Sequence, residues 1–275
     1  MYKRQNLSCG YDILGFCLDK VGDTIIVKKT AEQGLRISSI DKYDLPLSID
    51  KNVAGIAAKA MINEVRISHG LDIKIEKGIK PGSGIGSSAG SSVGTVFAIN
   101  QLLDSPFSLL DLVKFSMEGE RFVSGAYHAD NVAPIIFGGI TLVRTIDNLD
   151  IIPLPTPKEL EVVIVRPNIE IKTADSRKVV KKKVKIEKMT QQSANLGSFV
   201  SSLYSEDYDL MSRSVIDQVV EPDRAVLIPE FEKIKMVSKV SGSIAAGISG
   251  SGPSIFSLSN NRVTSNNILD KISDH

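Results

Sequence analysis

The 275-residue sequence has little of several features that would narrow its function at once. It has two cysteines, Cys9 and Cys17, which are too few and too oddly spaced for a disulfide framework or a zinc site. No apolar run approaches a membrane span, and the N-terminus lacks the basic-then-apolar pattern of a secretory signal. The net charge of +1 argues against a general nucleic-acid binder. We therefore expect a cytoplasmic globular protein with no membrane or nucleic-acid partner.

One stretch organises the rest of the chain: residues 81–90, which read PGSGIGSSAG. It follows residues 71–77 (LDIKIEK), whose alternating apolar side chains predict a strand. It precedes residues 91–103, an apolar and small-residue run that predicts a buried helix. A strand, a glycine-rich loop and a helix aim unpaired backbone N–H groups and the positive end of the helix at an anion. The loop has glycines for close approach and hydroxyls for phosphate or magnesium, at Gly82, Gly84 and Gly86 and at Ser83, Ser87 and Ser88.

Two well-known phosphate-binding loops do not fit this stretch. The P-loop needs a lysine after its last glycine, and none follows here. The dinucleotide fingerprint needs GxGxxG, whereas these glycines alternate as GxGxG. A bare GxGxG is as often a flexible turn as a binding site, and its position between a strand and a buried helix favours binding.

The flanking segments predict further helices and strands of an α/β fold. Residues 24–29 and 34–39 predict two strands paired with each other, and residues 52–65 predict an amphipathic helix. Ser108 is placed to cap a helix over residues 109–122.

That last helix contains two carboxylates, Glu118 and Glu120. Because they are two residues apart, they point to different helix faces, and at most one can face the loop. On spacing alone, a solvated helix carboxylate is the better interpretation.

Residues 148–158 gather three prolines and predict a domain boundary, with domains over residues 1–154 and 155–275. Beyond the boundary, lysines between positions 178 and 188 spread around their segment instead of forming a stripe, which is typical of a solvated surface.

Polar residues elsewhere are ambiguous when taken singly. Thr173 and Arg177 lie one helical turn apart, and Arg224 lies within EPDRAVLIP, but either arginine alone would be an ordinary surface charge. Residues 247–254 (GISGSGPS) predict a second glycine-rich turn. His128 has neither a nucleophile motif nor a second histidine at metal-ligand spacing, which favours a structural role.

Taken together, these stretches resemble the GHMP kinases and, among them, the homoserine kinases. The glycine-rich loop is similar to the superfamily pattern PxGxGLGSSA, with Ile85 in place of the usual leucine. Residues 6–19 (NLSCGYDILGFCLD), 124–144 (SGAYHADNVAPIIFGGITLVR) and 221–229 (EPDRAVLIP) are similar to homoserine kinase signatures. Residues 247–254 are similar to the third superfamily motif.

The resemblance implies a two-domain α/β fold (α+β, two-layer), with a ribosomal-protein-S5-like N-terminal domain and a ferredoxin-like C-terminal domain. It implies transfer of the ATP γ-phosphate to the hydroxyl of L-homoserine, with Mg²⁺, as a step of threonine biosynthesis. Dimers are common in the family, so a homodimer is a further expectation. The family pattern normally extends beyond both ends of this sequence, so we also expect a chain truncated at both ends.

The resemblance also implies the site residues. The nucleotide site contains Pro81, Gly82, Ser83, Gly84, Ile85, Gly86, Ser87, Ser88, Ala89, Gly90, Ser91, Gly250 and Gly252. The magnesium ligands are Ser88 and Glu120, and the substrate contacts are Asn6, Asp12, His128, Thr173, Arg177 and Arg224. Arginine forks match the substrate carboxylate, and Asp12 matches its ammonium group.

Asn131 and Arg177 are the implied catalytic residues. An amide cannot accept the hydroxyl proton, so catalysis would rest on in-line positioning and on stabilising charge at the γ-phosphate.

Two alternatives stay open. Another small-molecule GHMP kinase, acting on an alcohol without a carboxylate, would make Arg177 and Arg224 dispensable. An inactive nucleotide-binding fragment would bind Mg-ATP and phosphorylate no alcohol.

Overall fold

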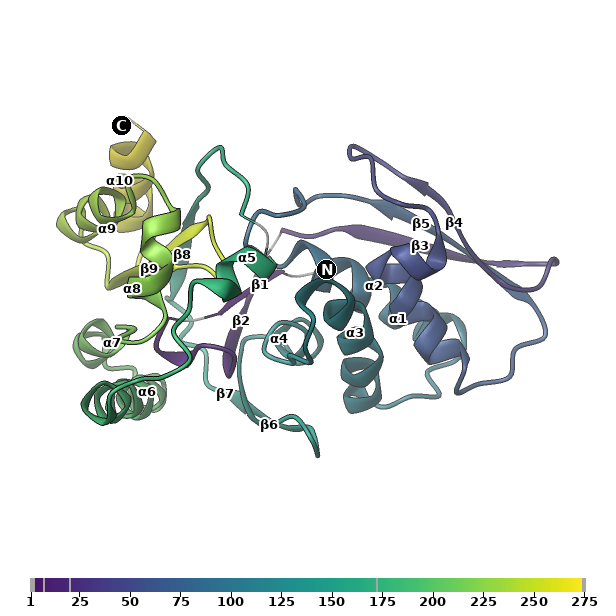
Figure 1. Ribbon diagram of the computed structural model, residues 1–275, viewed down its shortest axis with the longest axis horizontal. Helices are drawn as coiled ribbons and strands as arrows, with labels where there is room; N and C mark the ends of the chain where they lie inside the picture. The colour runs from purple at the N-terminus through teal and green to yellow at the C-terminus, as the bar shows by residue number, and fades with distance from the viewer. Residues whose placement is uncertain (1–2, 7, 20, 172, 274–275) are drawn as a thin grey trace. The chain divides into compact units, whose positions relative to one another are not determined.

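The computed structural model describes residues 3–6, 8–19, 21–171 and 173–273, and its chain divides into two compact units (Figure 1). Unit 1 contains residues 1–4, 16–81 and 86–152, and unit 2 contains residues 5–15, 82–85 and 153–275. Three of the five boundaries fall within strands of a four-stranded sheet, and the other two lie in the glycine-rich loop. The sheet is ordered β1-β2-β6-β7, with β1 (Lys3–Asn6), β2 (Leu14–Leu18), β6 (Ile140–Thr145) and β7 (Asp150–Leu154).

Unit 1 contains a three-stranded sheet ordered β3-β5-β4, with β3 (Thr24–Thr30), β4 (Leu35–Ile40) and β5 (Gly70–Glu76). The predicted pairing of residues 24–29 with 34–39 is therefore wrong, because β5 lies between the two strands. It runs antiparallel to β3 and parallel to β4. The alternating Leu71, Ile73 and Ile75 of β5 are almost completely buried, which suits the central strand of a sheet with one covered face.

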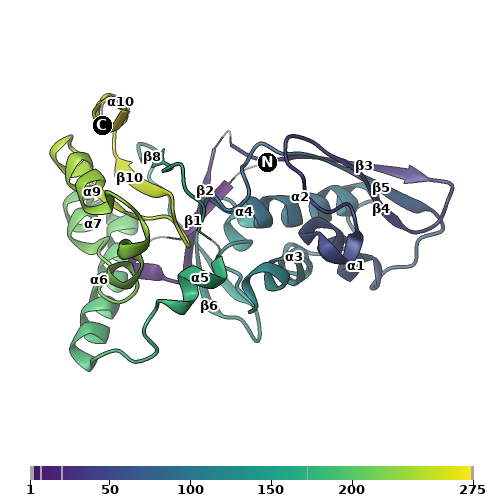
Figure 2. The same ribbon diagram turned by 45° about the horizontal axis from the view of Figure 1, so that its top comes forward.

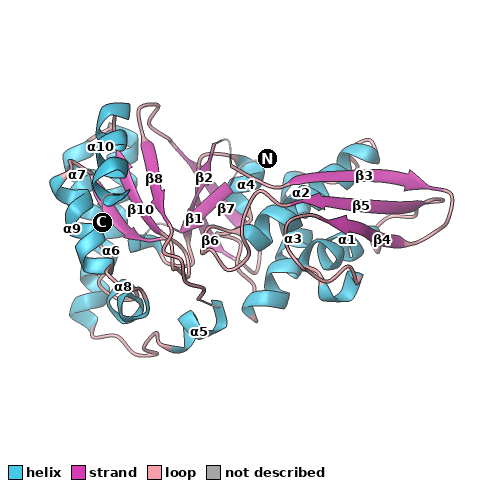
Figure 3. Ribbon diagram, turned by 90° about the horizontal axis from the view of Figure 1, so that it is seen from above, coloured by secondary structure: helices cyan, strands magenta, loops and turns pink. Residues whose placement is uncertain are grey.

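Three helices cover one face of this sheet, as Figure 3 shows: α1 (Val53–Ile62), α2 (Ser87–Leu102) and α3 (Leu109–Ser124). The Asn52 side chain caps α1 by accepting from the N–H of Ala54 at 2.9 Å. The predicted Ser108 cap is confirmed, since Ser108 and Asp111 form a reciprocal capping box at the start of α3. The core between sheet and helices contains Ile73, Ile99 and Leu112. The short helices η2 (Ile49–Lys51) and α4 (Ala133–Phe137) complete the unit.

Unit 2 contains an antiparallel sheet ordered β8-β10-β9, with β8 (Glu161–Val165), β9 (Ala245–Ile248) and β10 (Ile255–Ser259). Helices α9 (Phe231–Val240) and α10 (Arg262–Ser273) pack on this sheet, and α6 (Ile186–Ser205) packs with α7 (Tyr208–Ser214) (Figure 2). The shorter helices are η1 (Ser8–Gly10), α5 (Thr173–Lys178), α8 (Glu221–Arg224) and η3 (Ala225–Leu227).

Among the described residues, no helix combines the length and the apolar character that a membrane span needs.

Candidate active site

The first turn of α2 forms one end of the predicted phosphate-binding loop. The helix begins at Ser87, earlier than the predicted position 91, and its N-cap is Gly86, which has a φ of 75° and no side chain to cap the helix. The first-turn N–H groups therefore receive no acceptor from a cap side chain. The 16-residue helix also directs the positive end of its dipole to this place. This is the geometry by which helix N-termini bind phosphate.

The middle of the loop packs on the second glycine-rich turn within unit 2. The Ser249 hydroxyl donates to the carbonyl oxygen of Gly84 at 2.9 Å, and the Ser254 hydroxyl donates to that of Ser83 at 2.6 Å. Gly84 has a φ of +74°, and a Cβ there would lie 2.3 Å from the carbonyl oxygen of Gly252. Position 84 therefore requires glycine, and the two glycine-rich motifs form one backbone surface.

The loop hydroxyls differ in their availability to a ligand. Ser87 and Ser91 are buried within unit 1. The Ser87 hydroxyl donates to the carbonyl oxygen of Ile79 at 3.2 Å, and the Ser91 hydroxyl donates to the Asp23 carboxylate at 2.8 Å. Ser88 is only half-buried. Of the predicted ligand hydroxyls on α2, Ser88 is therefore the best placed to reach a ligand.

Glu120 and Glu118 lie on different faces of α3. Glu120 is 5% exposed, whereas Glu118 accepts a hydrogen bond at the surface from the Tyr127 hydroxyl at 2.8 Å. The interpretation of Glu120 as a solvated carboxylate, drawn from spacing alone, is wrong, because the helical period turns it inward with Ser116. A buried carboxylate and a hydroxyl are oxygen donors of the kind magnesium takes, so Glu120 and Ser88 fit that donor set.

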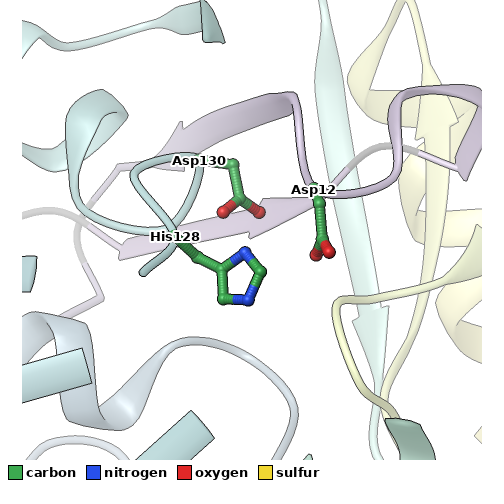
Figure 4. A group of neighbouring side chains, drawn as sticks. All are labelled: Asp12, His128 and Asp130. Carbon is green, nitrogen blue, oxygen red and sulfur yellow. The ribbon is translucent and has the colours of Figure 1, made fainter. Parts of the chain in front are cut away.

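The loop between α3 and α4 contributes His128, Asp130 and Asn131. Figure 4 shows His128 and Asp130 projecting from this loop of unit 1; it also labels Asp12, which belongs to unit 2. Asp130 is completely buried, while His128 and Asn131 are half-buried. Sequence analysis did not single out Asp130, because a polar residue in a turn gives no periodicity from which burial can be predicted.

Unit 2 brings together four of the predicted substrate residues: Asp12, Thr173, Arg177 and Arg224. Arg177, on α5, forms a two-bonded ion pair with Asp12, in which its terminal nitrogens donate to the two carboxylate oxygens at 3.1 and 3.0 Å. Thr173, one turn earlier on α5, has its hydroxyl 3.5 Å from that of Ser251 in the second glycine-rich turn.

Arg224 is 4% exposed, and its three nitrogens all donate hydrogen bonds. Nε donates to the carbonyl oxygen of Ser176 at 3.2 Å, Nη1 to that of Gly250 at 2.8 Å, and Nη2 to the Tyr11 hydroxyl at 3.3 Å. Burial lowers the pKa of Arg224, whereas Tyr11 and Asp12 act to raise it. Arg224 therefore ties α5 to the second glycine-rich turn.

Tyr11 completes this cluster, and sequence analysis did not predict it as a site residue. Its hydroxyl also accepts from Nη1 of Arg177 at 3.1 Å. Its ring faces both guanidinium groups, with centroid distances of 5.8 Å to Arg177 and 4.8 Å to Arg224. Burial, followed by the charge of Asp12, raises the pKa of the Tyr11 hydroxyl. A single aromatic residue in a turn carries no sequence pattern that marks it as functional.

Asn6 is the last residue of β1, and its side chain lies outside the described residues. His128 and Asn131 belong to unit 1, and the arginine cluster belongs to unit 2.

Comparison with protein families matches both halves of the chain. Residues 52–139 match the GHMP kinases N terminal domain, and residues 199–275 match the GHMP kinases C terminal domain. Together these segments make up more than half of the chain, and they confirm the predicted α/β fold.

Individual relatives agree with this family. A homoserine kinase of Chlorobium phaeobacteroides is 37% identical over 96% of this chain and 86% of its own length. One from Methanococcus maripaludis is 42% identical over 92% of this chain and 84% of its own length. The crystal structure of homoserine kinase from Cytophaga hutchinsonii is 39% identical, covers 99% of this chain and 88% of its own, and superimposes with a TM-score of 0.94.

Proposed function

The chain belongs to the homoserine kinase family of the GHMP kinases, and from this premise we propose that it transfers the γ-phosphate of ATP to the hydroxyl of L-homoserine. The products are O-phospho-L-homoserine and ADP, which places the reaction in threonine biosynthesis. In this proposal residues 1–154 form the ATP-binding domain and residues 155–275 form the second domain. A cytoplasmic location and a homodimer stay predictions.

The nucleotide phosphates bind where α2 begins. The uncapped first turn of the helix supports this assignment, since its N–H groups and dipole favour an anion. Ser88 and Glu120 would hold Mg²⁺, which when bound neutralises charge on the phosphates during transfer. The other loop residues contribute backbone and shape, as the fit of Gly84 against Gly252 indicates.

The acceptor is an amino acid, and the single observation that supports this most is the Asp12–Arg177 ion pair beside Arg224. An amino-acid head group carries an ammonium and a carboxylate next to each other. It can enter such a pair by giving its carboxylate to Arg177 and its ammonium to Asp12, so neither protein charge is left without a partner. The two side chains of the pair are 26% and 24% exposed, so solvent reaches them.

Catalysis in this proposal depends on position and electrostatics. Arg177 would stabilise negative charge, and Asn131 would orient the substrate hydroxyl toward the γ-phosphate. The Asn131 amide cannot take the proton, so the rate enhancement comes from in-line alignment and from stabilised phosphoryl charge.

The experiment that tests the proposal measures ADP release with Mg-ATP and a panel of acceptors: L-homoserine, mevalonate, galactose, shikimate and no acceptor. Of these acceptors, we expect only L-homoserine to support turnover. The turnover should fall sharply in Arg224→Ala, because that arginine holds α5 against the second glycine-rich turn. Turnover with a different alcohol would keep the kinase and reject the substrate. Binding of Mg-ATP without turnover on any alcohol would reject the proposed reaction.

A further inference from the structure

Unit 1 contains a buried ion pair between Asp23 and Lys77. Nζ of Lys77 lies 2.5 Å from Oδ2 of Asp23, and the two side chains are 2% (Lys77) and 0% (Asp23) exposed. Asp23 precedes β3 and Lys77 follows β5. Because Thr24 faces Glu76 in the antiparallel ladder, Asp23 and Lys77 are the next pair along the same two strands.

Lys77 reaches from the end of β5 to the first turns of α2. Its Nζ donates to the Ser91 hydroxyl at 2.9 Å and to the carbonyl oxygen of Ser87 at 3.4 Å. The Ser91 hydroxyl in turn donates to Oδ2 of Asp23 at 2.8 Å. All three ammonium hydrogens of Lys77 therefore have an acceptor at the start of the helix or on Asp23.

Asp23 holds the other end of the glycine-rich loop. Its Oδ1 accepts the backbone N–H of Gly78 at 3.0 Å and that of Ile79 at 3.2 Å. These residues lead into the loop, whereas Ser87 and Ser91 follow it. The network thus joins the entry and the exit of the loop across residues 80–86. A second link runs in parallel, from the Ser87 hydroxyl to the carbonyl oxygen of Ile79 at 3.2 Å.

A buried ion pair is a poor way to gain stability, because desolvating two charges offsets most of their attraction. Burial lowers the pKa of Lys77, which reflects this cost, while Asp23 acts to raise it. Two apolar side chains would fill the same place with less cost. What the ion pair adds is a set of directed hydrogen bonds to the backbone and helix on both sides of the loop.

We propose that Asp23, Lys77 and Ser91 are positioning residues that hold the glycine-rich loop and the first turn of α2 in their phosphate-binding conformation. They touch no phosphate themselves, and they act through Gly78, Ile79 and Ser87. The inference rests on the proposed nucleotide site. It also gives the Ser91 hydroxyl a role inside the protein in place of direct nucleotide contact.

The primary test replaces Lys77 with methionine, which keeps the length of the side chain and removes its hydrogen bonds. Isothermal titration with Mg-ADP should show affinity weakened about tenfold or more, since small displacements at a binding site have effects of this size or larger. The KM for ATP should rise in parallel while the KM for L-homoserine stays unchanged. The matched control is Leu71→Ala, which removes a completely buried side chain from β5, the strand that Lys77 follows. It should lower the melting temperature and leave nucleotide affinity unchanged.

Two further variants separate positioning from stability. In Asp23→Leu combined with Lys77→Met, no buried charge is left without its partner, so the melting temperature should recover relative to Lys77→Met alone. Nucleotide affinity should stay weak, because the bonds to the loop are still missing. Ser91→Ala keeps the ion pair, so it should fold and show a smaller loss of affinity. Unchanged affinity in both Lys77→Met and Ser91→Ala, or recovery of affinity together with stability in the double variant, would overturn the proposal.

Hydrogen exchange without nucleotide keeps this test independent of the proposed reaction. Amides of residues 78–91 should exchange faster in Lys77→Met than in Leu71→Ala at matched stability, and equal local exchange would contradict the inference. Wild-type protein that binds no nucleotide would instead reject the proposed function, and the exchange measurement would still decide whether the network positions the loop.

Discussion

The carboxylate of Asp12 accepts both bonds of the Arg177 guanidinium fork, at 3.1 and 3.0 Å. This planar, two-bonded arrangement is specific to arginine, because a lysine ammonium can offer only a point charge to the same carboxylate. The pair lies beside the second glycine-rich turn, to which Arg224 is bonded through Gly250. In the proposed substrate site, the two charges that would bind a zwitterion therefore already face each other.

Replacing Arg177 with lysine should raise the KM for L-homoserine about tenfold or more, because charge-assisted hydrogen bonds contribute about 1.5–3 kcal/mol each. The KM for ATP should stay the same. Steady-state kinetics with each substrate varied in turn make the measurement. The matched control is Arg262→Ala, which removes an exposed arginine of the same unit that lies 3.6 Å from Glu161. If the two variants behave alike, Arg177 is an ordinary surface charge.

Replacing Tyr11 with phenylalanine should lower the free energy of unfolding by about 1–3 kcal/mol, because the buried Arg224 then loses an acceptor. The ring that faces both arginines would remain. Urea unfolding followed by circular dichroism measures the change. Tyr208→Phe is the control, since the Tyr208 hydroxyl is buried and has no hydrogen-bond partner among the described residues. Tyr208→Phe should leave the free energy of unfolding unchanged or raise it slightly. An equal loss of unfolding free energy in both variants would contradict the assigned role of Tyr11.

Replacing Gly84 with alanine should weaken Mg-ADP binding strongly and destabilise the protein. The left-handed backbone costs an alanine about 1–2 kcal/mol, and its Cβ would also collide with the carbonyl oxygen of Gly252 at 2.3 Å. In the control, Gly197→Ala, the glycine lies within α6 and an added Cβ meets nothing within 4 Å. That change should stabilise the protein by about 0.5–1 kcal/mol. Calorimetry of both variants, with and without nucleotide, tests the contrast.

Replacing Glu120 with glutamine should raise the Mg²⁺ concentration needed for half-maximal activity, because a neutral amide is a weaker ligand for a hard cation than a carboxylate. A magnesium titration at fixed ATP measures this. Glu118→Gln supplies the control on the same helix, since Glu118 lies at the surface with Tyr127. Identical magnesium curves for the two variants would remove Glu120 from the proposed metal site.

The sequence was most informative where function depends on local backbone geometry. Gly82, Gly84 and Gly86 predicted a loop that lets a ligand approach the backbone closely, and all three glycines have positive φ angles in the structure. The helix capped by Ser108 followed from residues close together in the chain. Such features depend on neighbours in sequence, so propensity and capping rules are sufficient to predict them.

Features that depend on distant partners could not be predicted in this way. The pairing of β3 with β5 instead of β4 joins segments separated by more than one other element. Lys77 alternates in step with the buried Ile73 and Ile75, yet it is charged, and the partner that compensates its buried charge, Asp23, is 54 residues away in sequence. Glu120 and Tyr11 likewise gain their surroundings from elements that no local pattern specifies.

The most direct test of the account is to identify the product of the reaction. Wild-type protein is incubated with Mg-ATP and L-homoserine, and the mixture is followed by phosphorus NMR and mass spectrometry. The account predicts O-phospho-L-homoserine and ADP in equal amounts, with both formed about tenfold or more slowly in Arg177→Lys at the same homoserine concentration below saturation. ADP formed at the same rate with and without L-homoserine, and no phosphorylated amino acid, would contradict it.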